Sequence, residues 1–479
     1  MTKLKKIKIF SSFFLLLINS SCQLNPATGE KDFNLMSQEE EILIGKNEHK
    51  KIIKQYGGIY NDKKLYNYIN SLGKFIVNTT EQPDLNFTFT ILDTPLVNAF
   101  ALPGGYIYLT RGLIAICQNE AQLAGVIAHE IAHVTAKHAA RRYSKNIGTN
   151  ILTNILSVLA NNQAIGNLIN QSAGLYMLSY SRDQEYEADK LAIRYMNRAG
   201  FKSKEIGSLL RIMNNFSNFE SRRMNVKVKS GSDFLSTHPS SRKRVKAVIQ
   251  EAEKSSIPNP IIGKEIFLKK IDGLVFGDKV EEGVLTSKRF LHPKLNFLFE
   301  LTEDFHFINL PKRVVGRNKN ESKIVFDTEN YDNTTSLAEH LEKIIKVSKN
   351  QKIKKFFVNG LEAASSSFLK DGKKITLAII TDRKTIFRFI LIQAESQNEN
   401  TSFFKIVKSF KLLSEKDKKK IEPNRIKILS TKGIKNTDDL ISKQSIQKSF
   451  SRDLFEIIND ITQSNKRVEE KVKIIYNYF

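Results

Sequence analysis

Apolar residues recur at helical spacing through most of residues 34–254, and this periodicity predicts a mainly helical region. The segment 98–110 interrupts it with two glycines and a run of aromatic and β-branched residues, which is typical of strands. The most regular helix is predicted over 119–142 with Asn119 as its N-cap, and its apolar stripe consists of Leu123, Val126, Ile127 and Ile131. No apolar run reaches about 18 residues, so the pattern excludes an integral protein with several membrane spans.

The periodicity changes beyond residues 255–260, a stretch with two prolines that is typical of a linker. Residues 261–414 carry alternating or continuous runs of β-branched and aromatic residues, which predict strands mixed with helices. Within this region we expect a strand at 296–301, a hairpin made of 375–380 and 385–392, and helices near 335–348 and 401–412. A charged hinge at 414–420 leads to a polar tail that predicts one strand and two helices.

These changes divide the chain into four predicted parts, and its 479 residues exceed what one compact core usually holds. The parts are a targeting segment at 1–21, a mainly helical domain at 22–254, an α+β domain at 261–414 and a small C-terminal module at 421–479. The predicted fold class of the whole chain is therefore α+β.

The composition is globular, with 41% hydrophobic and 26% charged residues, which excludes a wholly disordered chain. The net charge of +25 is compatible with nucleic-acid binding, but the lysines are spread over the whole length among many Asn and Ile residues. We therefore interpret the charge as a compositional bias that favours an anionic membrane surface, and we expect no nucleic-acid partner. With Cys22 and Cys117 as the two cysteines, neither a disulfide scaffold nor a cysteine-based zinc cluster is expected.

The first residues have the layout of a secretory signal peptide, with lysines between residues 3 and 8 followed by the apolar run 9–18. Cys22 then stands in a position that resembles the lipidated cysteine of bacterial lipoproteins. Asn19 departs from that pattern, because an aliphatic residue usually stands three places before the cysteine, whereas here Ile18 lies one place further back. We expect lipidation of Cys22, with ordinary cleavage or an uncleaved anchor as the alternatives.

A histidine pair with the spacing of metal ligands stands within the helix predicted at 119–142. His129 and His133 are four residues apart and share one face of the helix, so both can bind one metal ion. Glu130 lies about 100° further round the helix and can reach a water molecule at that ion. Burying two histidines and a glutamate on an apolar helix is costly without partners, so we favour one zinc ion per chain over a polar pair on a core helix.

An open catalytic zinc site has three protein ligands, and a second helix supplies a candidate for the third. Glu185 and Asp189 lie four residues apart in the segment 181–192 and so face the same way. This spacing fits Glu185 as a zinc ligand and Asp189 as a carboxylate that orients a ligand histidine. An acidic helix face alone is usually just solvated, but beside the histidine pair we favour the metal-site interpretation.

These two segments resemble the gluzincin family of the CAAX-prenyl proteases and HtpX, and more closely its secreted bacterial BepA/LoiP-like members. Further marks of that group occur in the same order along the chain: Asn25–Gly29 after Cys22, then Asn98–Gly105, the two ligand helices, and Thr237-His238-Pro239. The resemblance covers roughly residues 22 to 250.

The resemblance implies a zincin protease domain with a small edge-strand sheet, and it also implies roles for single residues. Glu185 corresponds to the third zinc ligand and Glu130 to the general base. His238 corresponds to a histidine that approaches the zinc and either regulates the site or stabilises the transition state. His138 lies five residues beyond His133 on the predicted helix, so it points elsewhere, and we interpret it as structural.

The segment 98–110 is the predicted substrate-binding region. Gly104 and Gly105 precede the strand residues 106–109, which we expect to offer a sheet edge to a peptide through main-chain hydrogen bonds. An ordinary buried strand is the alternative. The predicted substrate-binding residues are Asn98, Ala99, Phe100, Gly104 and Gly105.

Three further segments give weaker indications. The apolar segment 151–160 is too short to span a bilayer, so it is predicted to be a lid, a membrane-facing surface or a core helix. Residues 261–414 resemble the accessory region of some alphaproteobacterial proteases of this type and contain no catalytic set. The tail resembles a degenerate LysM peptidoglycan-binding motif at 432–437.

The sequence therefore predicts a zinc-dependent endopeptidase of the bacterial cell envelope, located in the periplasm as a membrane-anchored lipoprotein. Its predicted substrates are misfolded or misassembled polypeptides, and peptidoglycan is a further predicted partner. The alternative is a chaperone or envelope-assembly factor with a structural or latent zinc site, because His238 as a fourth ligand would close the coordination shell.

Overall fold

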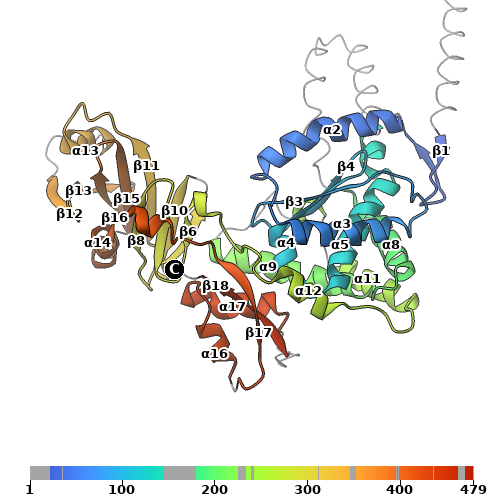
Figure 1. The fold of residues 1–479 in the computed structure, drawn as a ribbon. Coiled ribbons are helices and arrows are strands. Elements are labelled where there is room, and N and C mark those ends of the chain that lie inside the picture. The colour runs from blue at the N-terminus through green and yellow to red at the C-terminus, as the bar shows by residue number, and fades with distance from the viewer. Residues whose placement is uncertain are drawn as a thin grey trace, which may run out of the picture. The chain divides into compact units, whose positions relative to one another are not determined.

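The computed structural model of the chain describes residues 22–34, 36–144, 180–224, 234–238, 242–310, 312–345, 352–394, 396–397, 399–434, 436–461 and 470–477. The chain divides into two compact units, the first made of residues 1–218, 227–272 and 457–460 and the second of residues 219–226, 273–456 and 461–479. Helices and sheets occur in both units, so the predicted α+β class is confirmed (Figure 1). The boundaries of the four predicted parts stay predictions.

The first unit sets two small sheets among helices (Figure 1). Its helices are α2 (Gln38–Gln55), α3 (Lys63–Val77), α4 (Arg111–Ile116), α5 (Glu120–Thr135), α8 (Arg182–Arg198), α10 (Phe234–Thr237), α11 (Arg242–Lys254), α12 (Lys264–Ile271) and the part of α9 (Glu205–Met224) up to residue 218. Its strands are β1 (Cys22–Leu24) and β2 (Lys31–Phe33), which pair with each other, and β3 (Thr88–Leu92), β4 (Ala99–Leu102) and β5 (Tyr106–Thr110), which form the sheet β3-β5-β4.

Helix α5 is the centre of the first unit. It begins after Asn119, whose side chain accepts a hydrogen bond from the backbone N–H of Gln122, so the predicted N-cap is confirmed. Its side chains are buried on nearly every face, because α3, α8 and strand β4 pack around it. Polar groups on such a helix need partners within the protein.

The helix predicted over 119–142 is not continuous. Helix α5 ends at Thr135, and Lys137 adopts the left-handed conformation with φ of 53° before residues 138–144 become helical again. A left-handed residue breaks the direction of a right-handed helix. The residues beyond Lys137 are therefore directed differently from what helical periodicity predicts.

The order of the three-stranded sheet differs from expectation. Strand β5 pairs in parallel with β3 on one side and antiparallel with β4 on the other, so residues 106–109 lie in the centre and not at an edge. The edge strand on that side is β4. The prediction that 106–109 offers the sheet edge is therefore wrong, because strand order depends on long-range pairing that the local pattern does not encode.

The second unit contains a large antiparallel sheet with the order β12-β13-β14-β15-β11-β10-β9 and a smaller sheet with the order β16-β8-β7-β6. The strands are β6 (Val284–Leu285), β7 (Arg289–His292), β8 (Phe297–Glu300), β9 (His306–Leu310), β10 (Arg313–Arg317), β11 (Lys323–Asn330), β12 (Lys354–Val358), β13 (Leu361–Lys370), β14 (Lys373–Thr381), β15 (Thr385–Ala394) and β16 (Lys411–Leu412). Residues 280–418 also contain η2 (Val280–Glu282), α13 (Leu337–Ile345), α14 (Asn400–Ser409) and α15 (Glu415–Lys418). Strands β14 and β15 confirm the predicted hairpin.

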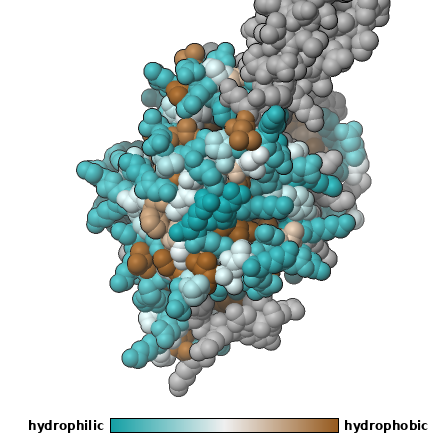
Figure 2. All heavy atoms as spheres, turned by 90° about the vertical axis from the view of Figure 1, so that its right-hand side faces the viewer, coloured by the Kyte–Doolittle hydropathy of each residue, from teal (hydrophilic) through white to brown (hydrophobic). Residues whose placement is uncertain are grey.

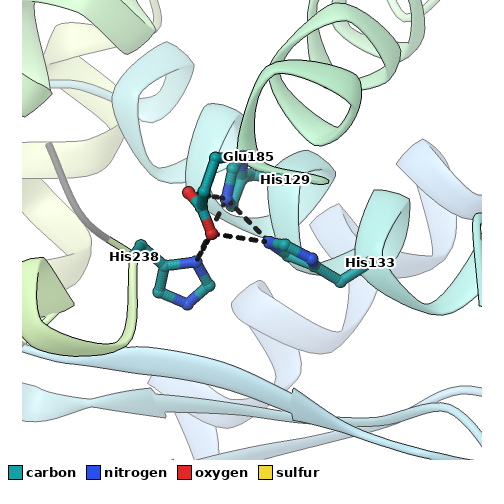
Figure 3. A group of neighbouring side chains, drawn as sticks. All are labelled: His129, His133, Glu185 and His238. Atoms are coloured by element: carbon teal, nitrogen blue, oxygen red, sulfur yellow. Dashed lines mark hydrogen bonds and ion pairs between the residues drawn. The ribbon is translucent and has the colours of Figure 1, made fainter. Parts of the chain in front are cut away.

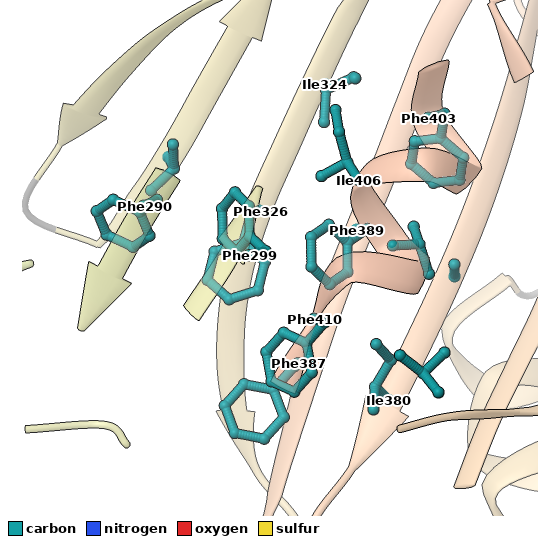
Figure 4. Packing of buried hydrophobic residues seen from close by; sticks show 14 of the residues in the cluster. Phe290, Phe299, Ile324, Phe326, Ile380, Phe387, Phe389, Phe403, Ile406 and Phe410 are labelled. Atoms are coloured by element: carbon teal, nitrogen blue, oxygen red, sulfur yellow. The ribbon is translucent and has the colours of Figure 1, made fainter. Parts of the chain in front are cut away.

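Phenylalanine side chains dominate the core of the second unit (Figure 4). One face of the large sheet packs against α14 and the phenylalanines of β7 and β8, and the other face packs against α13. Alternating residues of β14 and β15 supply the two faces in turn, as the pleat of a strand requires. The aromatic cluster includes Phe290, Phe299, Phe326, Phe387, Phe389, Phe403 and Phe410.

The end of the chain has the order strand, helix, helix, strand. Strands β17 (Arg425–Ser430) and β18 (Lys471–Tyr476) pair antiparallel, with α16 (Thr437–Ser442) and α17 (Lys448–Ile458) between them in sequence. Both helices contribute to a small core with Val472 and Ile474 of β18. The sequence predicted one strand here, and β18 was missed.

The distribution of apolar side chains on the surface can be followed on one face of the molecule. In Figure 2, one face of the molecule shows apolar side chains in small separate groups among hydrophilic residues. Within the described ranges, no helix has both the length and the hydropathy needed to cross a bilayer. The predicted signal peptide at 1–21 and the apolar segment 151–160 lie outside the described residues.

Candidate metal centre and active site

The two histidines predicted as metal ligands lie together on helix α5. The Nε2 atoms of His129 and His133 are 3.0 Å apart, and both side chains are buried. This arrangement follows from their four-residue spacing, which places them one above the other on the helix. Because Nε2 of each ring faces the other, both rings can direct a lone pair to one common point.

Helix α8 brings the predicted carboxylate to the same point. The helix begins with a reciprocal capping box between Ser181 and Gln184, which places Glu185 in its first turn. One oxygen of Glu185, Oε1, lies 3.6 Å from His133 Nε2, and the other, Oε2, lies 3.6 Å from His129 Nε2. Burial opposes ionisation of this carboxyl group, but the neighbouring His238 and His129 lower the pKa of Glu185 below its ordinary value.

A third histidine completes the cluster (Figure 3). His238 follows the short helix α10, and its Nδ1 lies 3.0 Å from Glu185 Oε1 and 3.3 Å from His129 Nε2. Its ring stacks on Phe234 with centroids 4.5 Å apart. The structure thus brings the four residues His129, His133, Glu185 and His238 together, with all ligand atoms within 4.8 Å of one another.

The chemistry and spacing of these donors fit zinc. Histidine nitrogen and carboxylate oxygen are both zinc ligands, with bonds of about 2.0–2.2 Å. In a tetrahedral shell, such bonds place neighbouring ligand atoms roughly 3.3 Å apart. The separations that involve His129 or Glu185, 3.0–3.6 Å, lie around that value, so the cluster is suited to hold a zinc ion.

Glu130 lies beside the cluster but makes no hydrogen bond to it. Its carboxylate is fully buried, and neither oxygen has a hydrogen-bond partner among the described residues. The Nε2 atom of His238 lies 3.4 Å from Oε1 of Glu130. Burial raises the pKa of Glu130, and His238 and His129 offset part of that rise. A buried carboxylate with free oxygens beside a metal centre can accept a proton from a water molecule.

Asp189 stands where its spacing predicted, behind His129. Its Oδ1 lies 3.1 Å from Nδ1 of His129, the nitrogen that faces away from the cluster. Arg244 of helix α11 holds the same carboxylate with two hydrogen bonds of 2.7 and 2.8 Å and also lies 2.5 Å from Glu185 Oε2. Burial raises the pKa of Asp189, but the hydrogen bonds and charge of Arg244 lower it below its ordinary value. Sequence reasoning missed Arg244, because nothing in the basic run 242–244 distinguishes it from the other cations.

The interpretation of His138 as pointing elsewhere is wrong. Its Nδ1 lies 2.7 Å from Nδ1 of His133, and its Nε2 lies 2.8 Å from Glu187 Oε2. On a continuous helix a residue five positions on would be turned by about 140° from His133. The left-handed Lys137 breaks the helix and changes the direction of the chain, so the ring of His138 lies beside that of His133.

The predicted substrate-binding residues divide into two groups. Asn98, Ala99 and Phe100 lie at or just before the edge strand β4, near the loop of His238, since Thr237 Oγ1 is 3.5 Å from Asn98 Oδ1. The side chain of Phe100 stacks on Tyr108 in a hydrophobic core. The phenyl ring of Phe100 is therefore part of the core, and the role of these three residues in substrate binding stays a prediction.

Gly104 and Gly105 form a tight turn between β4 and β5. Both have positive φ, of 77° and 84°. A Cβ on Gly104 would lie 2.6 Å from the backbone of Ile42 in α2, and one on Gly105 would lie 2.2 Å from the carbonyl oxygen of Asn86. Close packing explains these glycines, and their role in substrate binding stays a prediction.

Comparison with known proteins adds independent information. Residues 63–252 match the model of peptidase family M48. The chain is 28% identical over 229 residues to the mitochondrial metalloendopeptidase OMA1 of Schizosaccharomyces pombe, a match that covers 47% of this chain and 64% of that protein. It is 35% identical over 148 residues to OMA1 of Saccharomyces cerevisiae, with coverage of 31% and 41%.

A bacterial protein is also similar. The chain is 30% identical over 192 residues to the beta-barrel assembly-enhancing protease of Escherichia coli strain K12, a match that covers 38% of this chain and 37% of that protein. In each of these matches the chain spans less than two thirds of the relative's length.

Proposed function

We propose that this chain, in which residues 63–252 form a peptidase family M48 domain, is a zinc-dependent endopeptidase of the bacterial cell envelope. The observation that carries the proposal is the buried cluster of His129, His133 and Glu185 beside the unbonded carboxylate of Glu130. Two imidazoles and one carboxylate are a donor set of catalytic zinc. The names of the relatives, a metalloendopeptidase and a protease, support peptide-bond hydrolysis.

The proposed mechanism gives each residue one task. His129, His133 and Glu185 would hold the zinc ion, which when bound would supply a Lewis acid for the scissile carbonyl oxygen and lower the pKa of a water molecule to about 7. Glu130 accepts a proton as the water attacks the scissile carbon, and it returns the proton to the nitrogen of the leaving amine. Burial raises the pKa of Glu130, which favours uptake of the proton by its carboxylate.

Replacing the proposed base separates metal binding from catalysis. Glu130→Gln keeps the shape of the side chain, so we expect it to retain zinc while cleavage of casein falls by at least about a hundred-fold. His133→Ala should lose both zinc and cleavage. Glu120→Gln, on the same helix but away from the cluster, is the matched control and should keep both. Undiminished cleavage by Glu130→Gln would contradict the mechanism.

His238 gives the alternative function its basis. Its Nδ1 lies within the ligand cluster, so a four-ligand shell would exclude the attacking water and leave a latent or structural site. A chaperone or assembly factor is the corresponding function. Self-cleavage of His238→Ala distinguishes the roles: an increase identifies His238 as a brake, and a loss identifies it as a helper in the transition state.

The proposed substrates are misfolded or misassembled proteins, and the proposed location is the periplasm. The relative named beta-barrel assembly-enhancing protease supports a role in envelope assembly. Mass spectrometry of the proteins that accumulate with Glu130→Gln, compared with the parent chain, tests the substrate class. An unchanged set of envelope proteins would speak against it.

We also propose that Cys22 carries a lipid anchor and that diffuse positive charge adds a second attraction to the membrane. A single acyl anchor binds only marginally, so two attractions together make binding durable. Strand β1 begins at Cys22, so an anchor there would hold the first unit close to the membrane surface. Cys22→Ser should move the protein to the soluble periplasmic fraction, and complete retention in the membrane fraction would refute the anchor.

A second binding function is proposed for the C-terminal module. The observation that favours it is the strand-helix-helix-strand order of β17, α16, α17 and β18, which accompanies the weak LysM resemblance of the sequence. We expect the full chain to sediment with insoluble peptidoglycan and to be released by soluble peptidoglycan fragments. Equal sedimentation with cellulose would show that the binding is unspecific.

A further inference from the structure

We infer that His138, backed by Glu187 and Arg141, is a positioning residue that fixes the ring of His133 for metal binding. The inference rests on the proposed zinc site and concerns a residue outside the ligand cluster. It starts from what a ligand histidine requires. A ring that binds metal through Nε2 carries its hydrogen on Nδ1, and this hydrogen needs an acceptor that holds the ring in place.

The acceptor for His133 is another histidine. Nδ1 of His133 lies 2.7 Å from Nδ1 of His138, and both rings are buried. Two ring nitrogens at this distance share one hydrogen, since one must donate and the other accept. If His133 donates, then Nδ1 of His138 is unprotonated, and the hydrogen of its neutral ring is on Nε2.

The next contact selects this tautomer of His138. Its Nε2 lies 2.8 Å from Glu187 Oε2, and a carboxylate can only accept a hydrogen bond. Arg141 donates to the same oxygen at 2.7 Å, which holds the carboxylate of Glu187 in place. The hydrogen bonds thus run in one direction, from His133 to His138 and from His138 to Glu187.

The backbone is arranged to make this chain of contacts. The left-handed Lys137 ends α5 and starts the turn in which the N–H of Arg141 bonds to the carbonyl of Lys137. Gln184, the capping residue of α8, donates through Nε2 to the carbonyl oxygen of His138 at 3.1 Å. Both ligand helices therefore fix His138. On its other face, the ring of His133 is stacked on Tyr180, with centroids 3.7 Å apart.

Zinc affinity of the full-length chain, measured by competition with a fluorescent chelator, tests the inference. His138→Leu keeps the approximate volume and removes the acceptor, so we expect zinc binding to weaken by about 10–100-fold. His138→Asn places an amide oxygen near the position of Nδ1, so it should restore affinity to within roughly five-fold of the parent. His49→Leu is the matched control: it removes another histidine of the first unit, whose 2.7 Å bond goes to Tyr108, and should leave zinc affinity unchanged.

The outcomes are separable. Parent affinity in a folded His138→Leu protein would overturn the inference, as would equal losses in the Leu and Asn variants. If His138→Leu fails to fold, Glu187→Ala takes its place, because Glu187 is half-buried and its loss should still weaken zinc binding by several-fold. Unchanged affinity in Glu187→Ala would then overturn the inference. A parent chain that binds no zinc would instead refute the proposed function.

Discussion

His129 and His133 lie one turn apart on α5, yet the chain supports their outer nitrogens in different ways. Behind His129 stands one carboxylate, Asp189, held by Arg244 in a site that is almost completely buried. Behind His133 stands His138, which in turn contacts the carboxylate of Glu187. Arg141 pairs with that carboxylate, and both residues lie nearer the solvent. Each histidine needs a partner that orients its ring. For His129 this partner belongs to a buried ion pair, and for His133 it is the first of a row of hydrogen-bonded residues that reaches the surface.

The comparison teaches where each support is vulnerable. A buried ion pair that loses one partner leaves an uncompensated charge in a medium of low dielectric constant, which is strongly destabilising. A pair near the surface loses little, because water replaces the missing partner. Stability should therefore depend mainly on the support of His129, and the support of His133 should act mainly on zinc binding.

The largest expected effect comes from Arg244→Met. This change keeps much of the side-chain volume and leaves the carboxylates of Asp189 and Glu185 buried without their cation. We expect the free energy of unfolding to fall by about 3–5 kcal/mol. Urea unfolding of the metal-free protein measures it, and a loss below about 1 kcal/mol would remove the asymmetry between the two supports.

A smaller effect is expected from changes at Lys137, whose left-handed turn positions only the residues behind His133. Lys137→Val places a β-branched residue at φ of 53°, which costs about 1–2 kcal/mol, whereas Lys137→Gly relieves the same conformation. Both variants lose the contact of Lys137 with Glu41, so their difference isolates the backbone. We expect weaker zinc binding in the Val variant than in the Gly variant. Equal zinc affinities would show that the turn does not position His138.

The smallest effect is expected from Arg141→Met, the counterpart of the Arg244 change. The ion pair of Arg141 with Glu187 is partly exposed, with side chains 27% and 23% accessible. We expect a loss of stability below about 1 kcal/mol, measured by the same urea unfolding. A loss as large as that of Arg244→Met would mean that the two supports do not differ in the proposed way.

The two supports also differ in how far the sequence could predict them. His129, Glu130, His133, Glu185 and Asp189 could be identified, because four-residue spacing within one helix is a local property. Arg244 and the position of His138 could not. The contact of Arg244 with Asp189 joins residues 55 positions apart, and the position of His138 depends on one left-handed residue inside a pattern that looks continuously helical.

The fold shows the same division between local and long-range information. The N-cap at Asn119 and the hairpin of β14 and β15 follow from local patterns and were predicted. The central position of β5 and the existence of β18 depend on pairing between distant segments. Strand order decides which strand lies at the edge of the sheet, and here β4 and not β5 is an edge strand.

The central claim is that His129, His133 and Glu185 hold one zinc ion in this chain. The most direct test is native mass spectrometry of the purified full-length protein, with His133→Ala and the control His49→Leu measured beside it. We expect one zinc per chain in the parent and in His49→Leu, and none in His133→Ala, because the change breaks the imidazole pair on α5 and leaves only His129 and Glu185 of the proposed ligands beside His238. A His133→Ala protein that keeps one zinc per chain would contradict the account.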